Sequence, residues 1–154
     1  MSGATRPPVI VLEDDPLIAA FMSKALRKSG HVVECFDRGL AVLERVQGDP
    51  SALLLLDLGL PDIDGLEVLR RLRASGSTMP VIVVTSRSDP GDRVEALTLG
   101  VAGYVVKPFP LAELLASVEA AVAAIPPAGS VAGAPGPTAP TGPGGPSAPP
   151  GLNR

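Results

Sequence analysis

Short apolar runs alternate with amphipathic segments from Val9 to Ile125, and this alternation restricts the possible folds more than any other feature of the chain. Each run is rich in valine, isoleucine or leucine, and a segment with apolar residues at helical spacing follows it. Successive strand and helix units of this kind form a parallel sheet. The continuous apolar character of residues 32–36 and 52–56 favours strands covered on both faces. The sequence therefore predicts an α/β fold of five strands and five helices.

Capping residues indicate where these elements begin and end. Asp15-Pro16 and Asp89-Pro90 each combine an N-cap residue with a proline at the first helical position. Helices are expected to end near Gly30, Gly76 and Gly100. The expected strands comprise residues 9–12, 32–36, 52–56, 81–84 and 103–106. The expected helices comprise residues 16–29, 40–46, 66–74, 90–100 and 110–124.

Residues 126–154 have a different composition from the rest of the chain. Proline and glycine make up 16 of these 29 residues, and most of the others are alanine, serine or threonine. Such a segment buries too little apolar surface to fold, so we expect a disordered tail or linker. The sequence therefore predicts a single domain at residues 7–125, preceded by a disordered N-terminus at residues 1–6.

Charge and hydropathy exclude several classes of protein. Residues 1–125 hold 12 of the 13 basic side chains and all 16 acidic ones, for a net charge of −4. Direct nucleic acid binding is not expected without a basic stripe, because neutralisation of phosphates dominates such binding. The sequence has no apolar run typical of a membrane span or a signal peptide. We therefore expect a cytoplasmic protein without a membrane partner.

Several polar residues are expected to have structural roles only. His31, the single histidine, is predicted to be a surface residue, and the lone Cys35 is assigned no chemistry. Asp62 and Asp64 are expected to shape the turn before the third helix. A solvent-exposed helix face is predicted for Arg70, Arg71 and Arg73.

Polar and charged side chains follow four of the predicted strands at the point where each strand ends. Glu13 and Asp14 follow the first strand, and Asp57 follows the third. Thr85 follows the fourth strand and Lys107 the fifth. Because the carboxyl ends of parallel strands meet at one edge of the sheet, we expect these side chains to share a crevice.

The chemistry of that crevice indicates phosphorylation. Three carboxylates repel one another unless a cation joins them, and Mg²⁺ suits a site of a few carboxylates, retained waters and phosphate oxygens. An aspartate beside the metal can attack phosphorus to form an acyl phosphate. Lys107 and Thr85 can then contact the phosphoryl oxygens. The crevice is therefore predicted to be a phosphorylation site that binds Mg²⁺.

These residues resemble the receiver domain of two-component response regulators, the family that includes chemotaxis regulators. The resemblance rests on Glu13-Asp14-Asp15, Asp57 to Gly65, Thr85-Ser86 and Gly103 to Phe109, which occur in the order and spacing of the family. It implies a flavodoxin-like, doubly wound (βα)₅ fold with the strand order 2-1-3-4-5.

The resemblance also implies roles for the residues of the crevice. Asp57 would be the phosphoacceptor and a metal ligand. Asp14 would bind Mg²⁺ directly, Glu13 largely through water, and Gly59 through its carbonyl oxygen. This set of ligands would place the metal beside the phosphoryl group.

A second group of residues would bind the phosphoryl group and respond to it. Thr85 and Tyr104 would form a switch pair, in which the hydroxyl moves toward the phosphoryl group and the ring turns inward. Lys107 would pair with the phosphoryl oxygens, and Ser86 stands where the family usually has alanine or glycine. The resemblance also implies a cis peptide bond between Lys107 and Pro108.

The function implied by the resemblance is that of a signalling receiver. Its partners would be a histidine kinase or a histidine phosphotransfer protein, and an output protein that the sequence does not identify. Its only catalysis would be its own phosphorylation and slow dephosphorylation, so it would not be an enzyme in the usual sense. A monomer or weak dimer is expected.

Two alternative functions remain open. The chain could be the receiver part of a DNA-binding transcriptional regulator, with residues 126–154 as the linker to an absent effector domain. Ala102-Gly103 and residues 117–124 lack the charges that the winged-helix subclass usually carries for dimerisation. The chain could instead be an interaction module that works without phosphorylation.

Overall fold

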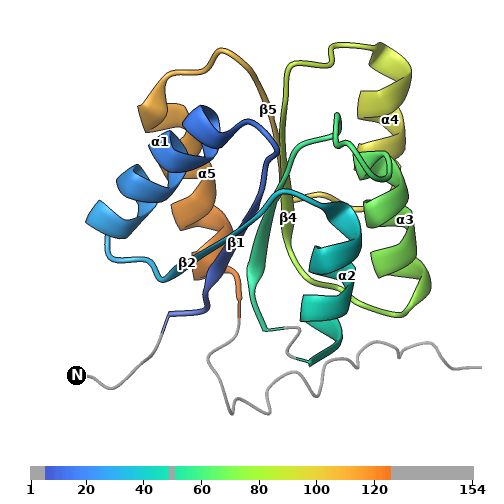
Figure 1. Ribbon diagram of the computed structural model, residues 1–154, viewed down its shortest axis with the longest axis horizontal. Coiled ribbons are helices and arrows are strands. Elements are labelled where there is room, and N and C mark those ends of the chain that lie inside the picture. Colours follow the sequence, from blue (N-terminus) through green and yellow to red (C-terminus); the bar gives the residue numbers. More distant parts are fainter. Residues whose placement is uncertain (1–5, 49–50, 126–154) are drawn as a thin grey trace, which may run out of the picture. The chain divides into compact units, whose positions relative to one another are not determined.

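Within the part of the chain that the computed structural model describes, five parallel strands form one sheet in the order β2-β1-β3-β4-β5 (Figure 1). The described residues are 6–48 and 51–125, and all of them belong to one compact unit. The strands are β1 (Val9–Leu12), β2 (Val33–Phe36), β3 (Leu53–Leu56), β4 (Val81–Thr85) and β5 (Gly103–Val106). The helices are α1 (Pro16–Lys28), α2 (Gly39–Gly48), α3 (Gly65–Ala74), α4 (Pro90–Thr98) and α5 (Leu111–Ala123). The predicted fold class and strand order are confirmed.

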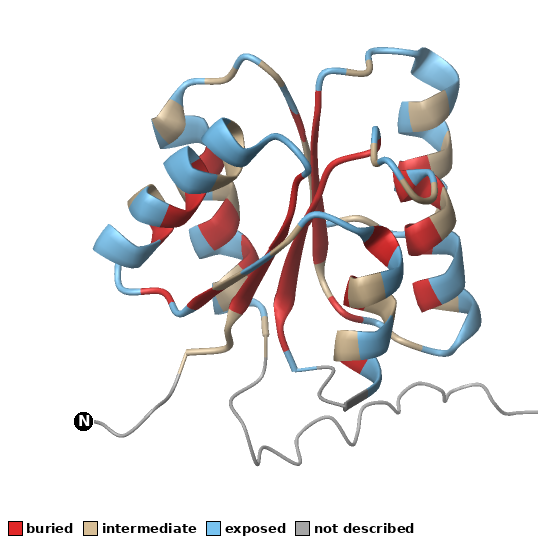
Figure 2. Cartoon of the chain, in the orientation of Figure 1, coloured by how far each residue is buried: buried red, intermediate tan, exposed pale blue. Residues whose placement is uncertain are grey.

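Helices cover both faces of the sheet. Helices α1 and α5 lie on one face, and α2, α3 and α4 lie on the other (Figure 1). Successive side chains of β1 point to opposite layers, so Ile10 and Leu12 join the core under α2, α3 and α4, whereas Val9 and Val11 join the core under α1 and α5. Figure 2 shows the buried residues concentrated in the central strands and on the helix faces that cover them.

The central and edge strands differ in burial. Every residue of β1, β3 and β4 is buried, whereas only Val33 is buried in β2. The prediction that residues 32–36 are covered on both faces is therefore wrong. Apolar composition indicates that a segment forms a strand, but it does not show where the strand lies in the sheet. Strand β2 lies at an edge of the sheet, where helices cover it incompletely.

Helix boundaries agree with the capping prediction to within a few residues. The Asp15 carboxylate accepts a hydrogen bond from the Leu17 backbone N–H at 2.9 Å, and the Asp89 carboxylate accepts one from the Gly91 N–H at 3.0 Å. The three glycines expected to end helices have positive φ angles. These glycines are Gly30, Gly76 and Gly100.

His31 is buried, so its prediction as a surface residue is wrong. Its side chain has no exposed area, and its Nε2 atom lies 2.8 Å from a carboxylate oxygen of Glu119 on α5. Arg6 pairs with the same carboxylate at 2.7 Å and donates to the Ser29 carbonyl. The predicted N-terminal tail includes Arg6, but these contacts place Arg6 in the folded domain. The predictions for residues 1–5 and 126–154 lie outside the described residues.

Replacing Glu119 with glutamine should lower the free energy of unfolding by roughly 0.5 kcal/mol at neutral pH, because His31 and Arg6 lose a charged partner, and water partly screens these pairs since the Glu119 side chain is about half exposed. The hydrogen bonds from His31 and then Arg6 hold the pKa of Glu119 below its usual value. The stabilisation is therefore present above the ordinary carboxyl range and is lost as the pH falls through the lowered pKa. Urea unfolding at several pH values should show the difference narrowing toward acid pH. The exposed Glu113 on α5 provides the matched control, and an equal effect of Glu113→Gln would contradict this role.

The predicted arginine face is correct for two of its three members. Arg70 and Arg71 are exposed and pair with Glu67. Arg73 is half-buried, so its prediction is wrong. Its guanidinium donates to the carbonyls of Ser77, Met79, Leu99 and Gly100. Arg73 thus connects the end of α3 to the loop after α4.

None of the helices in the described ranges is long and apolar enough to cross a membrane.

Candidate functional site

Three carboxylates form an acidic cluster at the carboxyl ends of β1 and β3. Oxygen atoms of Glu13, Asp14 and Asp57 all lie within 4.8 Å of one another. Leu12 pairs with Leu56 in the sheet, and this register places the residues that follow the two strands side by side. Glu13 and Asp57 are buried, whereas Asp14 is exposed. Such a group of oxygen donors is suited to a hard divalent cation.

Lys107 reaches the acidic cluster from the end of β5. Its Nζ atom lies 2.6 Å from Glu13 Oε1 and 3.4 Å from Asp57 Oδ2. Burial acts to lower the pKa of Lys107, but its hydrogen bond to Glu13 and the charge of Asp57 outweigh burial and raise that pKa. Burial raises the pKa of Glu13, although the hydrogen bond from Lys107 opposes this shift. The ammonium group therefore remains charged and offsets part of the negative charge.

The cluster lies in a cleft of about 690 Å³ at the carboxyl edge of the sheet. All of the predicted site residues except Tyr104 line this cleft. Thr85, the last residue of β4, is almost fully buried, and its hydroxyl accepts a hydrogen bond from the Arg87 backbone N–H at 3.1 Å. Ser86 follows it in the cleft wall, and the Lys107–Pro108 peptide bond is cis.

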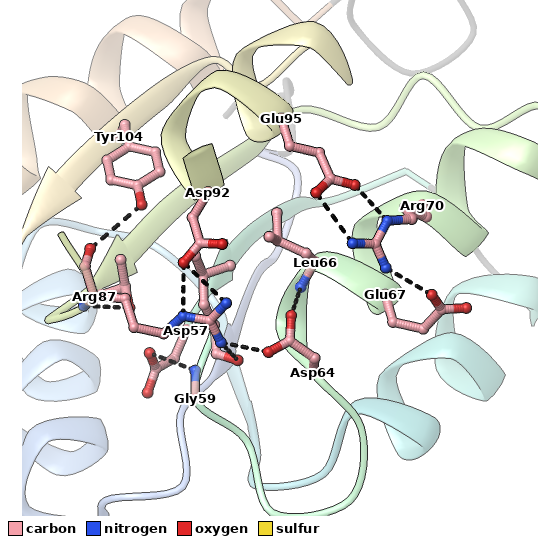
Figure 3. A network of polar contacts seen from close by, with 12 residues as sticks. Asp57, Gly59, Asp64, Leu66, Glu67, Arg70, Arg87, Asp92, Glu95 and Tyr104 are labelled. Atoms are coloured by element: carbon pink, nitrogen blue, oxygen red, sulfur yellow. Dashed lines mark hydrogen bonds and ion pairs between the residues drawn. The ribbon is translucent and has the colours of Figure 1, made fainter. Parts of the chain in front are cut away.

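Tyr104 lies outside the cleft and contacts the loop that follows β4. Its hydroxyl is 3.4 Å from the Arg87 carbonyl oxygen (Figure 3). The Arg93 guanidinium lies 5.1 Å from the centre of its ring, within the range of a cation–π contact. Burial raises the pKa of the phenol, which therefore stays protonated at neutral pH. Tyr104 and Thr85 are thus connected through the backbone of Arg87.

The loop after β3 holds Asp57 and leads directly into α3. The Gly59 N–H donates to Asp57 Oδ1 at 3.3 Å, and Asp64 caps α3 by accepting from the Leu66 N–H at 3.0 Å (Figure 3). A Cβ atom on Gly65 would lie only 2.4 Å from the Asp57 carbonyl oxygen. The backbone of α3 therefore approaches that of Asp57 so closely that only glycine fits.

Sequence reasoning missed Gly65 as a packing residue and did not single out Arg87. A signal for Gly65 was its place at the end of the Asp57 motif, directly before the predicted helix. Arg87 lies two residues after Thr85 and lines the cleft. Its guanidinium pairs with Asp64 and Asp92 (Figure 3), and neither residue is predicted from the sequence to have a role at the cleft.

The sequence matches the family model of the response regulator receiver domain over residues 9–119. This chain belongs to the response regulator receiver family. It is therefore a receiver of two-component signal transduction. Receivers are phosphoacceptors, and they do not turn over a separate substrate.

Several curated relatives of this receiver are named as transcriptional regulators. The transcriptional regulatory protein TctD of Salmonella typhimurium is 41% identical over 112 residues, which cover 73% of this chain and 50% of TctD. The transcriptional activator protein IrlR of Burkholderia pseudomallei is 40% identical over 110 residues, which cover 71% of this chain and 48% of IrlR. This chain thus spans about half the length of the curated relatives it matches.

Solved receiver structures have the same fold. The BeF3-activated N-terminal receiver domain of Klebsiella pneumoniae RstA aligns with a TM-score of 0.69 and 29% sequence identity. The alignment covers 75% of this chain and 97% of the Klebsiella chain. The likeness therefore extends over nearly the whole of that receiver domain.

Proposed function

We propose that Asp57 is the phosphoacceptor of this receiver and takes its phosphoryl group from a histidine kinase or a histidine phosphotransfer protein. The observation that carries the proposal is the position of its carboxylate, within reach of two further carboxylates and 3.4 Å from the Lys107 ammonium. A nucleophile on phosphorus needs positive charge to balance the oxygens of the incoming group. Asp57 has both a cation and a group of metal-ligating oxygens beside it.

The acidic cluster fits Mg²⁺. Asp14 is exposed and suited to bind the metal directly, whereas Glu13 already accepts hydrogen bonds from Lys107 and from the Asp15 N–H at 3.1 Å, which suits contact through water. Asp57 and the Gly59 carbonyl complete the proposed ligands. When bound, Mg²⁺ supplies neutralisation of charge on the transferring phosphoryl group.

The proposed transfer is a displacement at phosphorus. An Asp57 carboxylate oxygen forms the new P–O bond while the P–N bond of the donor phosphohistidine breaks, and the bonding electrons leave with the imidazole. Lys107 exchanges its contact with Asp57 for one with a phosphoryl oxygen. The Thr85 hydroxyl accepts from Arg87 N–H, so its own proton remains available for a second phosphoryl oxygen. Slow hydrolysis of the acyl phosphate then restores Asp57.

Thr85 and Tyr104 are the proposed switch pair. When Thr85 turns toward the phosphoryl group, the loop after β4 shifts, and the Tyr104 ring turns into the space that the loop leaves. Ser86 lies beside Thr85 and adds a hydroxyl to the cleft wall. The shift would alter the surface formed by α4, β5 and α5, to which an output protein binds.

Incubation with a small phosphodonor should give a labile adduct of one phosphoryl group when Mg²⁺ is present and little or none in chelator. The reason is that three carboxylates otherwise repel the incoming anion. Intact-mass spectrometry measures the adduct, and a heat-unfolded sample provides the control for non-specific modification. An adduct formed equally in chelator would contradict the metal site. No adduct under either condition would favour a phosphorylation-independent interaction module.

The second candidate function is that of the receiver part of a DNA-binding transcriptional regulator. It is favoured by the names of the curated relatives and by their length, about twice the part that matches here. The net charge of residues 1–125 argues against nucleic acid binding by the receiver itself, so DNA contact would belong to an effector domain. A cytoplasmic location suits either candidate. A longer reading frame that encodes such a domain after residue 154 would establish this function.

A further inference from the structure

Arg87 joins three separate elements around the proposed phosphorylation site. Its Nε and Nη2 atoms both lie 3.0 Å from Asp92 Oδ2 on α4. Its Nη1 atom donates to the Leu58 carbonyl at 3.2 Å and to the Asp64 carboxylate (Figure 3). Leu58 directly follows Asp57, and Asp64 caps α3. The side chain therefore ties the loop after β4 to the loop that carries Asp57 and to the start of α4.

The backbone of Arg87 contacts both members of the proposed switch pair. Its N–H donates to the Thr85 hydroxyl, and its carbonyl accepts from the Tyr104 hydroxyl. A side chain that fixes Arg87 also fixes the resting positions of these two hydroxyls. Among the described residues, only Arg87 is hydrogen-bonded to the side chains of both Thr85 and Tyr104.

The ion pairs of Arg87 with Asp64 and Asp92 stabilise the arrangement that the loop after β4 has in this structure. Asp64 and Asp92 face the same guanidinium, which separates two like charges that would otherwise repel each other. The Asp92 side chain is only 17% exposed, so water screens this pair less than an ordinary surface ion pair. Most of the guanidinium N–H groups are committed to these partners, and few remain for an incoming phosphoryl group.

We propose that Arg87 is a positioning residue that clamps the loop after β4 in its resting arrangement. When Thr85 turns toward a phosphoryl group, the loop must shift, and the contacts of Arg87 with Leu58, Asp64 and Asp92 must stretch or break. The clamp therefore opposes the phosphorylated arrangement. Its strength sets how readily a phosphoryl group at Asp57 changes the surface near Tyr104. This inference rests on the proposed function of Asp57.

The clamp predicts that Arg87→Gln binds beryllofluoride, a mimic of the phosphoryl group, about threefold to tenfold more tightly than the unmodified receiver when Mg²⁺ is present. The reason is that the variant no longer breaks the clamp on binding. Titration followed by NMR measures the affinity. In the ligand-free variant, the resonances of Tyr104 and the loop after β4 should already lie part of the way toward their beryllofluoride-bound positions.

Arg71→Gln is the matched control, because Arg71 loses only an exposed ion pair with Glu67 on α3. Its affinity and resonances should equal those of the unmodified receiver. Asp92→Asn removes a partner of Arg87 without changing Arg87 itself. Like Arg87→Gln, it should tighten beryllofluoride binding and shift the resonances of the loop, but by a smaller amount. It also tests the clamp if Arg87→Gln does not fold. A double variant of both positions should show less than the sum of the two effects.

The possible outcomes distinguish a failure of the proposed clamp from a failure of the proposed phosphorylation of Asp57. If the unmodified receiver binds beryllofluoride and both clamp variants bind it equally well or more weakly, the clamp is wrong. Weaker binding by Arg87→Gln alone would assign the guanidinium to the phosphoryl group instead. If neither the unmodified receiver nor Arg71→Gln binds beryllofluoride, the proposed phosphorylation of Asp57 is wrong, and the clamp is overturned with it.

Discussion

Asp57→Asn is expected to form no detectable acyl phosphate under conditions in which the unmodified receiver is fully modified. The amide has nearly the same shape as the carboxylate, but it lacks the anionic oxygen that attacks phosphorus. It also removes one negative charge from the acidic cluster. The rate of adduct formation should fall by at least about two orders of magnitude. Glu13, the other carboxylate of the cluster that contacts Lys107, already accepts hydrogen bonds from Lys107 and from the Asp15 N–H, so it is not expected to replace Asp57 as the nucleophile.

The measurement is intact-mass spectrometry with a small phosphodonor and Mg²⁺. Asp62→Asn is the matched control, because Asp62 lies in the same loop but accepts from the Gly39 and Leu40 N–H groups at 2.9 Å, away from the cleft. Its adduct should form at the normal rate. Retention of a labile adduct by Asp57→Asn, or its loss in Asp62→Asn without unfolding, would show that another residue accepts the phosphoryl group.

Gly65→Ala is expected to lower the free energy of unfolding by about 3 kcal/mol. The added Cβ would lie 2.4 Å from the Asp57 carbonyl oxygen and 2.5 Å from the Leu58 Cα. Both neighbours are backbone atoms, so no side-chain rotation can relieve the overlap. The loop after β3 must move, and its movement should also slow phosphorylation of Asp57, because the carboxylate leaves its place beside Lys107 and the acidic cluster.

Chemical denaturation measures the stability of this variant, and the phosphodonor reaction measures the site. Gly91→Ala is the matched control, because its Cβ would meet only Asp89 side-chain atoms at 3.6 Å or more. Alanine also favours the first turn of α4 more than glycine does, so this control should be close to neutral or slightly more stable. A loss below about 1 kcal/mol for Gly65→Ala would mean that the loop yields more easily than its packing indicates.

The sheet and the acidic cluster were predictable because they depend on local pattern and one topological rule. Apolar runs such as residues 53–56 indicate strands, and the rule that parallel strands end at one edge brings Asp57 and Glu13 to the same edge. That their strands are neighbours followed from the strand order implied by the resemblance to the receiver family, and the structure has this order. Asp15 and Asp89 act on N–H groups two residues away, so their capping roles could be read from sequence. Interactions over a few residues leave a visible signal in the order of residues.

Long-range contacts left no such signal. His31 and Glu119 are 88 residues apart, and Arg73 finds its carbonyl partners up to 27 residues away. The sequence predicts surface positions for His31 and Arg73, because the residues next to each of them in the chain do not indicate what packs against it. The edge position of β2 is likewise a property of the whole sheet; the resemblance to the receiver family implied it, whereas the residues of β2 alone did not indicate it.

The sequence by itself determined the kinds of elements, their order and the edge where the polar groups gather. Only the tertiary structure decided that Arg87 links Asp64 to Asp92 and that Gly65 meets the backbone of Asp57. The physical reason is the separation along the chain between the residues that interact. Hydrogen bonds within a turn and apolar periodicity act between neighbours in the chain, whereas charge pairing and close packing act between atoms that become neighbours only after the strands and helices have assembled.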